Sequence, residues 1–429
     1  MNPMGDFFTS PWKGQVKPKY PARPITPAPR TPELARAQPG TMDSAVGPYV
    51  NDEHNSRVIS KLGQIGQFRP KWTFVPPDQD VAGSVLMTGE RVLAPCGFGC
   101  YILDRKDGRM LSQVRQLSGS PTIDPVNSLL YCKDLFGLVG GYRIEDGQKA
   151  FSLFLQGGKE FHQELIARWG SRLLTVSTAL PANEPPDPEK TMIELTELGE
   201  PPYKSWDDPS GPRVVKSLIY GSSRMMAAMH GDTLVVATHD RIFTIDRELE
   251  IQTELTCSFG PMALSLDEAG RIYILVYFGG KRDVFLGGHY ALWLLTPEGE
   301  GLWAYDLPEG MQVCFPPIIG YDHTVYLFAA PGGYDVNGQQ LYAISPEGKL
   351  KWSHPVPGHY AHAVVTADDY LLVSEGPDIA AYDPTGVRRV LCTFPNEELC
   401  SPPLLTDKGE ILVASRTAVH CLEPITNEK

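Results

Sequence analysis

The sequence predicts an all-β fold, an eight-bladed β-propeller built from four-stranded antiparallel blades. Three observations predict it. Short apolar runs separated by turns recur from residue 79 onward with a period of about 40–50 residues, a spacing typical of propellers and solenoids. The chain contains 41 glycines and 39 prolines, which indicates many tight turns. A tryptophan-bearing segment that closes complete units also occurs once ahead of the first unit, as RPKWTF (69–74).

The clearest units begin with a proline-containing strand and continue through a turn into a second strand. In each of them the first proline lies ten positions before its match in the next strand, as in Pro316 to Tyr326. A third strand then ends in a polar residue and glycine, as in QLYAISPEG, and a fourth strand carries Trp303 or Trp352. Four such antiparallel strands make one propeller blade. The segments that show the proline start are SGSPTIDPVNSLLYCKD (118–134), CFPPIIGYDHTVYLFA (314–329) and CSPPLLTDKGEILVAS (400–415).

Eight units can be counted, and the eighth provides only three strands, ending in AVHCLEP. We therefore expect residues 69–76 to supply its fourth strand by pairing beside Val419–Glu423, which closes the ring and removes exposed edges. The propeller then spans residues 68–429, and residues 1–67 form an extended, proline-rich arm whose segment 56–68 forms a helical turn or an edge strand. The units are 79–118, 119–158, 160–208, 222–258, 259–308, 310–357, 358–396 and 398 onward.

The repeat S-P-x-h…h-Y-h…L-Y-A-I-S-P-E-G-K-L-K-W, where h is apolar, resembles the quinoprotein (PQQ-like) repeat over about residues 70–425. The resemblance implies an eight-bladed propeller similar to bacterial quinoprotein dehydrogenases and to the non-catalytic BamB-type propellers. It also implies that an enzyme of this family uses a disulfide between adjacent cysteines and a calcium ion held by carboxylate and amide side chains. This sequence contains neither adjacent cysteines nor a C-x-x-C-H haem motif. We therefore expect no catalytic residue and no cofactor, with a quinone-dependent or other propeller enzyme as an alternative.

Charge is distributed unevenly along the chain. The net charge is −13, yet residues 1–40 contain six lysines and arginines against two acidic residues. An acidic body argues against nucleic acid as a partner, because phosphate binding requires clustered basic residues. The basic arm suits contact with an acidic protein surface of the same chain or of another. Its expected contact residues, within or beside the polyproline-like stretch 17–32, are Lys17, Lys19, Arg23 and Arg30.

Targeting and metal signals are weak. No apolar run is long enough to span a membrane, and the N-terminus lacks the apolar core of a signal peptide. Eight cysteines are scattered, and only CGFGC (96–100) is closely spaced, which is a poor metal motif. We therefore expect a cytoplasmic protein with reduced thiols and no bound metal.

One position can be followed through the first strands of all eight units. Among these residues only Glu164 and His362 can titrate, and they fall on opposite sides of the ring, so a shared metal ion is not expected. A small-molecule or metal site at the mouth of the central channel, formed by Glu164, Arg224 and His362, is the first alternative function. The equivalent residues are Gly83, Pro121, Glu164, Met225, Ala263, Pro316, His362 and Pro402.

The repeats are interrupted by long insertions, which are often functional. Three fall between strands 2 and 3, at 178–190, 277–290 and 330–340, and residues 205–224 are interpreted as a connection from the third unit to the fourth. We expect all four on one face, over units 3 to 6. They predict a non-catalytic scaffold subunit of a larger, bacterial-type assembly, with other protein subunits as partners and no substrate assigned. The expected contact aromatics are Trp206, Tyr277, Phe278, Phe285, Tyr290 and Tyr334.

Overall fold

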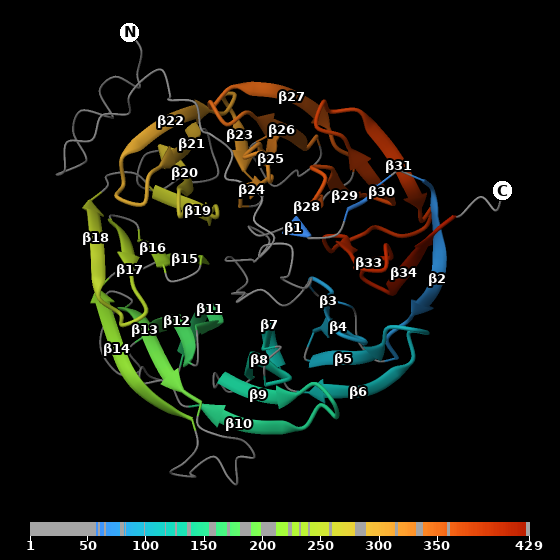
Figure 1. Ribbon diagram of the computed structural model, residues 1–429, viewed down its shortest axis with the longest axis horizontal. Helices are drawn as coiled ribbons and strands as arrows, with labels where there is room; N and C mark the ends of the chain where they lie inside the picture. The colour runs from blue at the N-terminus through green and yellow to red at the C-terminus, as the bar shows by residue number, and fades with distance from the viewer. Residues whose placement is uncertain are drawn as a thin grey trace.

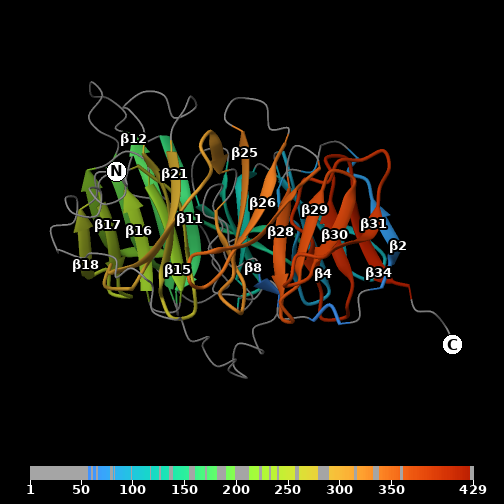
Figure 2. The same ribbon diagram turned by 90° about the horizontal axis from the view of Figure 1, so that it is seen from above.

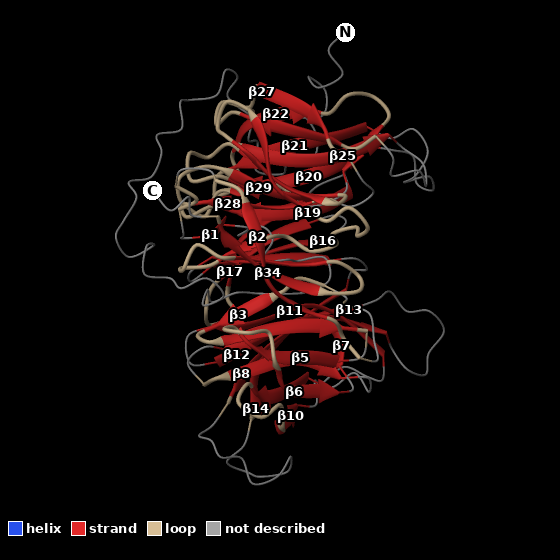
Figure 3. Ribbon diagram, turned by 90° about the vertical axis from the view of Figure 1, so that its right-hand side faces the viewer, coloured by secondary structure: helices blue, strands red, loops and turns tan. Residues whose placement is uncertain are grey.

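In the computed structural model, the strands form eight separate sheets arranged around a common axis, as Figure 1 shows, and the four strands of each blade are antiparallel. Figure 3 shows that strands and loops make up the described part of the chain, with no helix. The predicted all-β, eight-bladed propeller is therefore confirmed. The structure describes residues 57–58, 61–63, 66–77, 81, 83–97, 99–115, 117–124, 127–134, 139–153, 160–169, 172–180, 190–198, 212–221, 225–230, 233–238, 241–256, 260–278, 289–313, 316–331, 338–357 and 361–425.

Each blade is one sheet whose first strand lies nearest the axis. Blade 1 contains β3 (Leu86–Thr88), β4 (Arg91–Cys96), β5 (Gly99–Asp104) and β6 (Met110–Arg115), and blade 2 contains β7 (Leu117–Asp124), β8 (Leu129–Asp134), β9 (Val139–Arg143) and β10 (Lys149–Leu153). Blade 3 contains β11 (Glu160–Trp169), β12 (Arg172–Leu180), β13 (Lys190–Glu197) and β14 (Arg213–Gly221). Blade 4 contains β15 (Met225–His230), β16 (Thr233–Thr238), β17 (Arg241–Ile245) and β18 (Ile251–Thr256).

Blade 6 has a first strand that is split in two around Pro316 and Pro317. Blade 5 contains β19 (Gly260–Leu266), β20 (Ile272–Phe278), β21 (His289–Leu295) and β22 (Gly301–Asp306), and blade 6 contains β23 (Met311–Val313), β24 (Ile318–Ile319), β25 (Val325–Pro331), β26 (Gln340–Ile344) and β27 (Leu350–Pro355). Blade 7 contains β28 (His362–Thr366), β29 (Leu371–Glu375), β30 (Asp378–Tyr382) and β31 (Arg388–Thr393). Blade 8 contains β32 (Leu404–Leu405), β33 (Ile411–Ala414), β34 (Val419–Pro424) and β2 (Phe68–Phe74).

The strands cross the thickness of the disc, as the side view in Figure 2 shows. Because consecutive strands of a blade are antiparallel, its connections alternate between the two faces. We call the face with the strand 2–3 connections and the blade-to-blade connections the 2–3 face. The opposite face, with the strand 1–2 and strand 3–4 turns, is the 1–2 face.

The structure of blade 3 contradicts the prediction that residues 205–224 connect blade 3 to blade 4. Its fourth strand is β14, which pairs with β13 from Lys190↔Gly221 to Glu197↔Arg213. The segment 205–224 is therefore not simply a connection between blades, because residues 213–221 within it form a strand of blade 3. The strand was missed because RVVKSLIYG carries no tryptophan and follows a stretch rich in proline, glycine and aspartate. The connection between β13 and β14 consequently belongs to the 1–2 face, not to the face of the other insertions.

The closing strand β2 confirms the predicted ring closure. It pairs antiparallel with β34, from Phe68↔Pro424 to Phe74↔Val419. Arg69 and Glu423 add an exposed ion pair at 2.8 Å. The strand β2, near the start of the described chain, and the last strand, β34, are thus neighbours in one sheet, and the eighth blade is completed from the opposite end of the chain (Figure 1).

Tryptophans of fourth strands join each of three blades to the next. The indole of Trp72 lies over Gly108 of blade 1, where an added Cβ would come within 2.5 Å of the ring, and its Nε1 donates to the Arg105 carbonyl at 2.9 Å. A positive φ of 72° also suits this turn position to glycine. The same contact recurs twice around the ring, for Trp303 with Gly348 and for Trp352 with Gly386.

A buried ionic cluster reinforces the seam between blades 8 and 1. The Arg105 side chain is 3% exposed and donates from Nε to Glu410 at 3.1 Å and from Nη2 to Asp407 at 2.7 Å. Lys71 of the closing strand binds the other Glu410 oxygen at 2.6 Å. Buried charges are tolerated only when paired in this way. The cluster therefore ties β2, blade 8 and blade 1 together.

Candidate functional site

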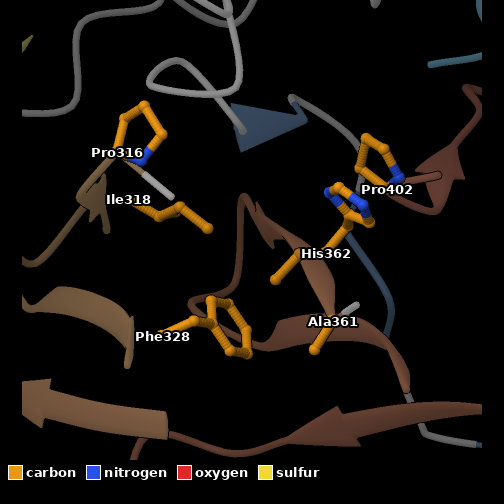
Figure 4. Close-up of a pocket in the computed structure, with 7 residues that line it drawn as sticks. Pro316, Ile318, Phe328, Ala361, His362 and Pro402 are labelled. Atoms are coloured by element: carbon orange, nitrogen blue, oxygen red, sulfur yellow. The ribbon is translucent and has the colours of Figure 1, made fainter. Parts of the chain in front are cut away.

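A small pocket lies beside the axis where blades 6, 7 and 8 meet. Figure 4 shows its labelled residues, which are mostly apolar. Most of them lie in the first strands or just before them, and Phe328 lies in β25, the second strand of blade 6. Three of them, Pro316, His362 and Pro402, are the members from blades 6, 7 and 8 of the set of equivalent positions found in the sequence. Three neighbouring blades thus each contribute the residue at the equivalent position to the lining of this pocket. The full lining is Pro316, Ile318, Phe328, Ala361, His362, Ala363 and Pro402.

His362 supplies the titratable group of this pocket. Desolvation by burial lowers the pKa of His362 to about 4, because a charged imidazole is disfavoured away from water. The ring is therefore neutral at pH 7. A neutral imidazole has one nitrogen that donates a hydrogen bond and one that accepts, so the pocket offers an apolar wall with one uncharged polar group.

Two other residues, Glu164 and Arg224, were expected at the channel mouth with His362. Glu164 lies in β11 of blade 3, where the pairing with β12 shifts register between Gln163 and Leu165. Arg224 lies outside the described residues. Blades 3 and 7 are on opposite sides of the ring. Glu164 and His362 are therefore separated, as the sequence predicted.

The N-terminal arm contacts the propeller at the same blade. β1 (Arg57–Val58) pairs with β28 in parallel, with Arg57 opposite Val365 and Val58 opposite Thr366. Figure 1 shows β1 near the axis, beside β28. The segment 56–68 was expected to form a helical turn or an edge strand, and the structure places this edge strand on the inside of blade 7. A strand of two residues is too short to show an alternating pattern of apolar and polar side chains, so its partner strand could not be predicted.

Asp368 anchors the chain just after β1. Its carboxylate accepts hydrogen bonds from the backbone N–H groups of Leu62 and Gly63, both at 3.0 Å, and one from the Thr366 hydroxyl at 2.7 Å. Leu62 also packs against the apolar core shared by blades 7 and 8. Sequence reasoning missed Asp368, because a single aspartate in a strand 1–2 turn resembles the turn aspartates of other blades.

The long strand 2–3 connections rise from well-packed stems. In blade 5, Tyr277 and Tyr290 lie directly opposite each other in β20 and β21, and their ring centroids are 5.0 Å apart. They are only 7% and 4% exposed. This burial contradicts the expectation that these two tyrosines contact a partner; they hold the base of the connection instead. Cross-strand pairing, which the insertion boundaries in the sequence do not reveal, is the physical reason.

The blade 6 connection is fixed close to the pocket. Gln339, which is fully buried at its end, accepts a hydrogen bond from the N–H of Ala361 at 3.2 Å through its side chain. Its backbone carbonyl accepts another from Val356 at 2.9 Å. The base of this connection therefore contacts the segment that leads into His362.

The remaining expected contact residues are not described structurally. Trp206, Phe285 and Tyr334 lie outside the described residues, and Phe278 is described only as part of the β20 backbone, opposite His289. The arm residues lie outside as well: Lys17, Lys19, Arg23 and Arg30.

Three further features are absent from the described residues. No group of three or more histidine, cysteine, aspartate or glutamate side chains is placed to hold a metal ion among them. The described residues contain no helix that is long and apolar enough to cross a membrane. The six cysteines within the described ranges carry no disulfide bond: Cys96, Cys100, Cys132, Cys392, Cys400 and Cys421.

Comparisons with known proteins identify the fold. No family model and no curated protein matches the sequence. Among solved structures, BamB from Moraxella catarrhalis is similar with a TM-score of 0.56 and 10% identity, over 83% of this chain and 99% of that one. The quinohemoprotein alcohol dehydrogenase of Comamonas testosteroni is similar with a TM-score of 0.61 and 10% identity, over 94% and 84%. The computationally designed Ika8 protein has a TM-score of 0.55 and 11% identity, over 84% and 100%.

These similarities show that the fold is an eight-bladed β-propeller, similar to the folds of BamB and of a quinohemoprotein alcohol dehydrogenase. The expected resemblance is confirmed at that level. At such low identity the likeness concerns the fold, and the similar structures include both BamB and a dehydrogenase. Function must therefore be argued from this chain's own surfaces.

Proposed function

We propose that the protein is a non-catalytic interaction platform within a larger protein assembly of the bacterial cytoplasm. One observation carries the proposal: three long strand 2–3 connections belong to the same face of a closed ring. They run from Leu180 to Lys190, from Phe278 to His289 and from Pro331 to Gln340. Blade 1, in contrast, turns from Cys96 directly to Gly99. Long loops on a rigid frame are common binding elements.

The proposed contacts are the insertion residues and the basic arm. Phe285 and Tyr334 belong to two of the three connections, and Phe278 ends the strand that leads into one of them. Trp206 is left out, because its connection belongs to the 1–2 face. The arm adds positive charge to an acidic body and suits an acidic protein partner. Its proposed contact residues are Lys17, Lys19, Arg23 and Arg30.

Two observations favour a platform over an enzyme. The sequence lacks the adjacent cysteines and the haem motif that the family resemblance would require of a quinoprotein dehydrogenase. The pocket at blades 6 to 8 offers a single titratable side chain, His362, in an apolar lining, whereas acid–base chemistry generally uses positioned pairs of such groups. The cytoplasm is proposed because the six described cysteines form no disulfide bonds.

The test is co-purification from the source cells, followed by mass spectrometry. Variants with the 181–189, 279–288 or 332–339 connection shortened to a tight turn should lose partners, and deletion of 1–40 should weaken their retention. Shortening 199–211 is the matched control, because that connection is also long but belongs to the 1–2 face. Unchanged partners after all three connections are shortened together would refute the proposal.

A ligand-binding propeller is the second candidate, favoured by the pocket at His362. A metal or metabolite that binds there should raise the melting temperature of the folded protein. His362→Ala should abolish that rise, whereas Glu164→Ala should not, because Glu164 lies across the ring. A panel of metals and metabolites without any such rise would eliminate this candidate.

A further inference from the structure

A hydroxyl, an imidazole and a carboxylate form a chain of hydrogen bonds at the rim of blade 8. The Thr73 hydroxyl of β2 lies 3.1 Å from Nδ1 of His420, the residue directly opposite it in β34. The other ring nitrogen of His420, Nε2, lies 3.1 Å from a carboxylate oxygen of Glu397. Glu397 belongs to the connection from β31 of blade 7 to β32 of blade 8. Figures 1 and 2 show β31, β34 and β2 together at the rim of the disc.

The carboxylate determines which ring nitrogen of His420 carries the hydrogen. Burial raises the pKa of Glu397, but the hydrogen bonds from Ser415 and His420 outweigh it and lower the pKa overall, so Glu397 is charged at neutral pH. A carboxylate only accepts hydrogen bonds, and in the neutral ring Nε2 therefore carries the hydrogen and donates it to Glu397. Nδ1 is then the acceptor, and the Thr73 hydroxyl donates to it.

The imidazole of His420 is held in one orientation. The side chain is only 2% exposed, and the ring of Phe394 packs against it with the two centroids 4.4 Å apart. Glu397 is fixed in turn by the hydroxyl of Ser415, which donates to the same carboxylate oxygen that His420 contacts. Ser415 is itself 1% exposed. The base and the group that orients it are therefore in place before any reactant arrives.

Thr73 differs from these partners because it is exposed to solvent. It belongs to β2, the outermost strand of blade 8, and lies near the end of that strand at the 2–3 face. A reactant can therefore reach the hydroxyl from solvent, while the base beside it stays shielded. A hydroxyl within hydrogen-bond reach of a base, where the base is oriented by a third group, is the arrangement that activates a nucleophile.

We propose that Thr73 is an acyl-acceptor site, with His420 as its general base and Glu397 as the residue that positions the base. The reactant is an activated acyl donor, an ester or a thioester. Oγ1 of Thr73 attacks the carbonyl carbon while its proton passes to Nδ1 of His420. The bond from that carbon to the leaving group breaks, and the imidazolium returns the proton to the leaving group. The acyl group ends as an ester on Thr73, and nothing is oxidised or reduced.

The site takes up a single acyl group per chain, so it is a modification site. The inference therefore does not rest on the proposed platform function. Because Thr73 lies at the 2–3 face, the modification would change the surface from which the long connections of blades 3, 5 and 6 arise.

The full chain treated with p-nitrophenyl acetate at neutral pH tests the site. The wild type should gain an acetyl group at Thr73, located by peptide mass spectrometry, with release of an equal amount of p-nitrophenolate. Thr393 is the internal control, because it is also exposed in a fourth strand, but its hydroxyl donates to the carboxylate of Asp378 at 2.7 Å and not to an imidazole. Thr73 should be acetylated about 100-fold faster than Thr393, or more, the usual gain from a positioned base.

Three sets of variants assign the roles. Thr73→Val keeps the shape of the side chain without its hydroxyl and should abolish the modification, whereas Thr73→Ser should retain it. His420→Asn offers a hydrogen-bond acceptor but no base, and should slow acetylation about 100-fold or more. Glu397→Gln should also slow it, and Glu397→Asp, which keeps the charge, should restore part of the rate. A purely structural role of Glu397 would leave the two variants alike.

Three results would overturn the inference. In the first, Thr73 of the wild type is acetylated no faster than Thr393. In the second, His420→Asn melts at the wild-type temperature and acetylates Thr73 at the wild-type rate. In the third, p-nitrophenolate release that requires Thr73 continues far beyond one equivalent, which would mean that the acyl group is hydrolysed and not kept. If His420→Asn does not fold, the comparison of Thr73 with Thr393 still decides, because it needs no variant.

Discussion

The indole of Trp72 donates a hydrogen bond to the backbone carbonyl of Arg105 at 2.9 Å, across the seam where the last blade meets the first. Trp303 makes the equivalent bond to Pro346 at 2.8 Å, between two consecutive blades inside the ring. The seam is therefore packed like the boundary between blades 5 and 6. Its difference is that the strand bearing Trp72 is supplied by the other end of the chain.

Replacing Trp72 by alanine should destabilise the propeller by about 3–5 kcal/mol, the range typical of deleting a large buried aromatic side chain. It should also open the seam locally, so that limited proteolysis cuts first within 66–77 and near residue 425. Trp303→Ala is the control: it should cost a similar amount in urea unfolding but leave these segments protected. Identical cleavage patterns in both variants would argue against a distinct seam.

Gly108→Ala should also destabilise the seam. The new Cβ would lie 2.5 Å from the Trp72 ring, at a φ of 72° that disfavours any side chain. The expected loss is about 2–4 kcal/mol, from overpacking and backbone strain together. Gly310→Ala is the matched control, because its φ is 80° and no atom lies within 4 Å of the added Cβ. Its loss should be limited to the strain, about 1 kcal/mol.

Glu410 should make the stability of the seam dependent on pH. Desolvation raises the pKa of Glu410, but the hydrogen bonds from Lys71 and Arg105, and their charges, outweigh it and lower the pKa overall. Its stabilising contribution is therefore complete above the unfolded-state pKa of about 4.3, and it is lost as the pH falls through the lower pKa of the folded protein.

Glu410→Gln should cost about 2–3 kcal/mol at pH 7, because Arg105 stays buried with a weaker partner. Between pH 5 and 3, the free energy of unfolding should fall less steeply in this variant than in the wild type. Glu423→Gln is the control, since its partner Arg69 is 66% exposed and such surface pairs contribute little. Parallel pH profiles for wild type and Glu410→Gln would contradict the assigned role.

Asp368→Ala should release the anchor that follows β1. The N–H groups of Leu62 and Gly63 would lose their shared acceptor, and their hydrogen exchange should accelerate about ten-fold or more, the equivalent of a bond worth about 1.5 kcal/mol. Asp246→Ala removes a comparable turn carboxylate in blade 4, which accepts from Glu248 and Glu250. That control should leave exchange at residues 62 and 63 unchanged.

The blade count and the ring closure could be predicted from sequence because they rest on a repeated local signal. Trp303 and Trp352 mark the fourth strand of complete units, so Trp72 marked the same strand out of order. Where that signal is absent, as in RVVKSLIYG of blade 3, the strand was missed and its neighbouring connection was assigned to the wrong face.

Contacts between residues that are far apart in the chain could not be predicted from the sequence. Arg105 and Glu410 are 305 positions apart, and nothing in either segment indicates that they meet. Tyr277 and Tyr290 flank an insertion and were taken for exposed contacts, whereas strand pairing sets them face to face in the blade. The parallel pairing of β1 could not be predicted either, because two residues define no pattern. The candidate site therefore depends on the structure far more than the fold does.

The position of the closing strand also imposes an order on synthesis. Arg69 and its partner Glu423 are 354 residues apart, so at about 5–20 residues per second the closing strand waits roughly 20–70 s for its neighbour to be made. During that interval it is an open edge that could pair with other nascent chains. Pro70 lacks a backbone donor, and Arg69 and Lys71 carry charge, features that discourage such pairing. The strand that completes the ring thus also carries features that disfavour pairing with other chains before β34 is synthesised.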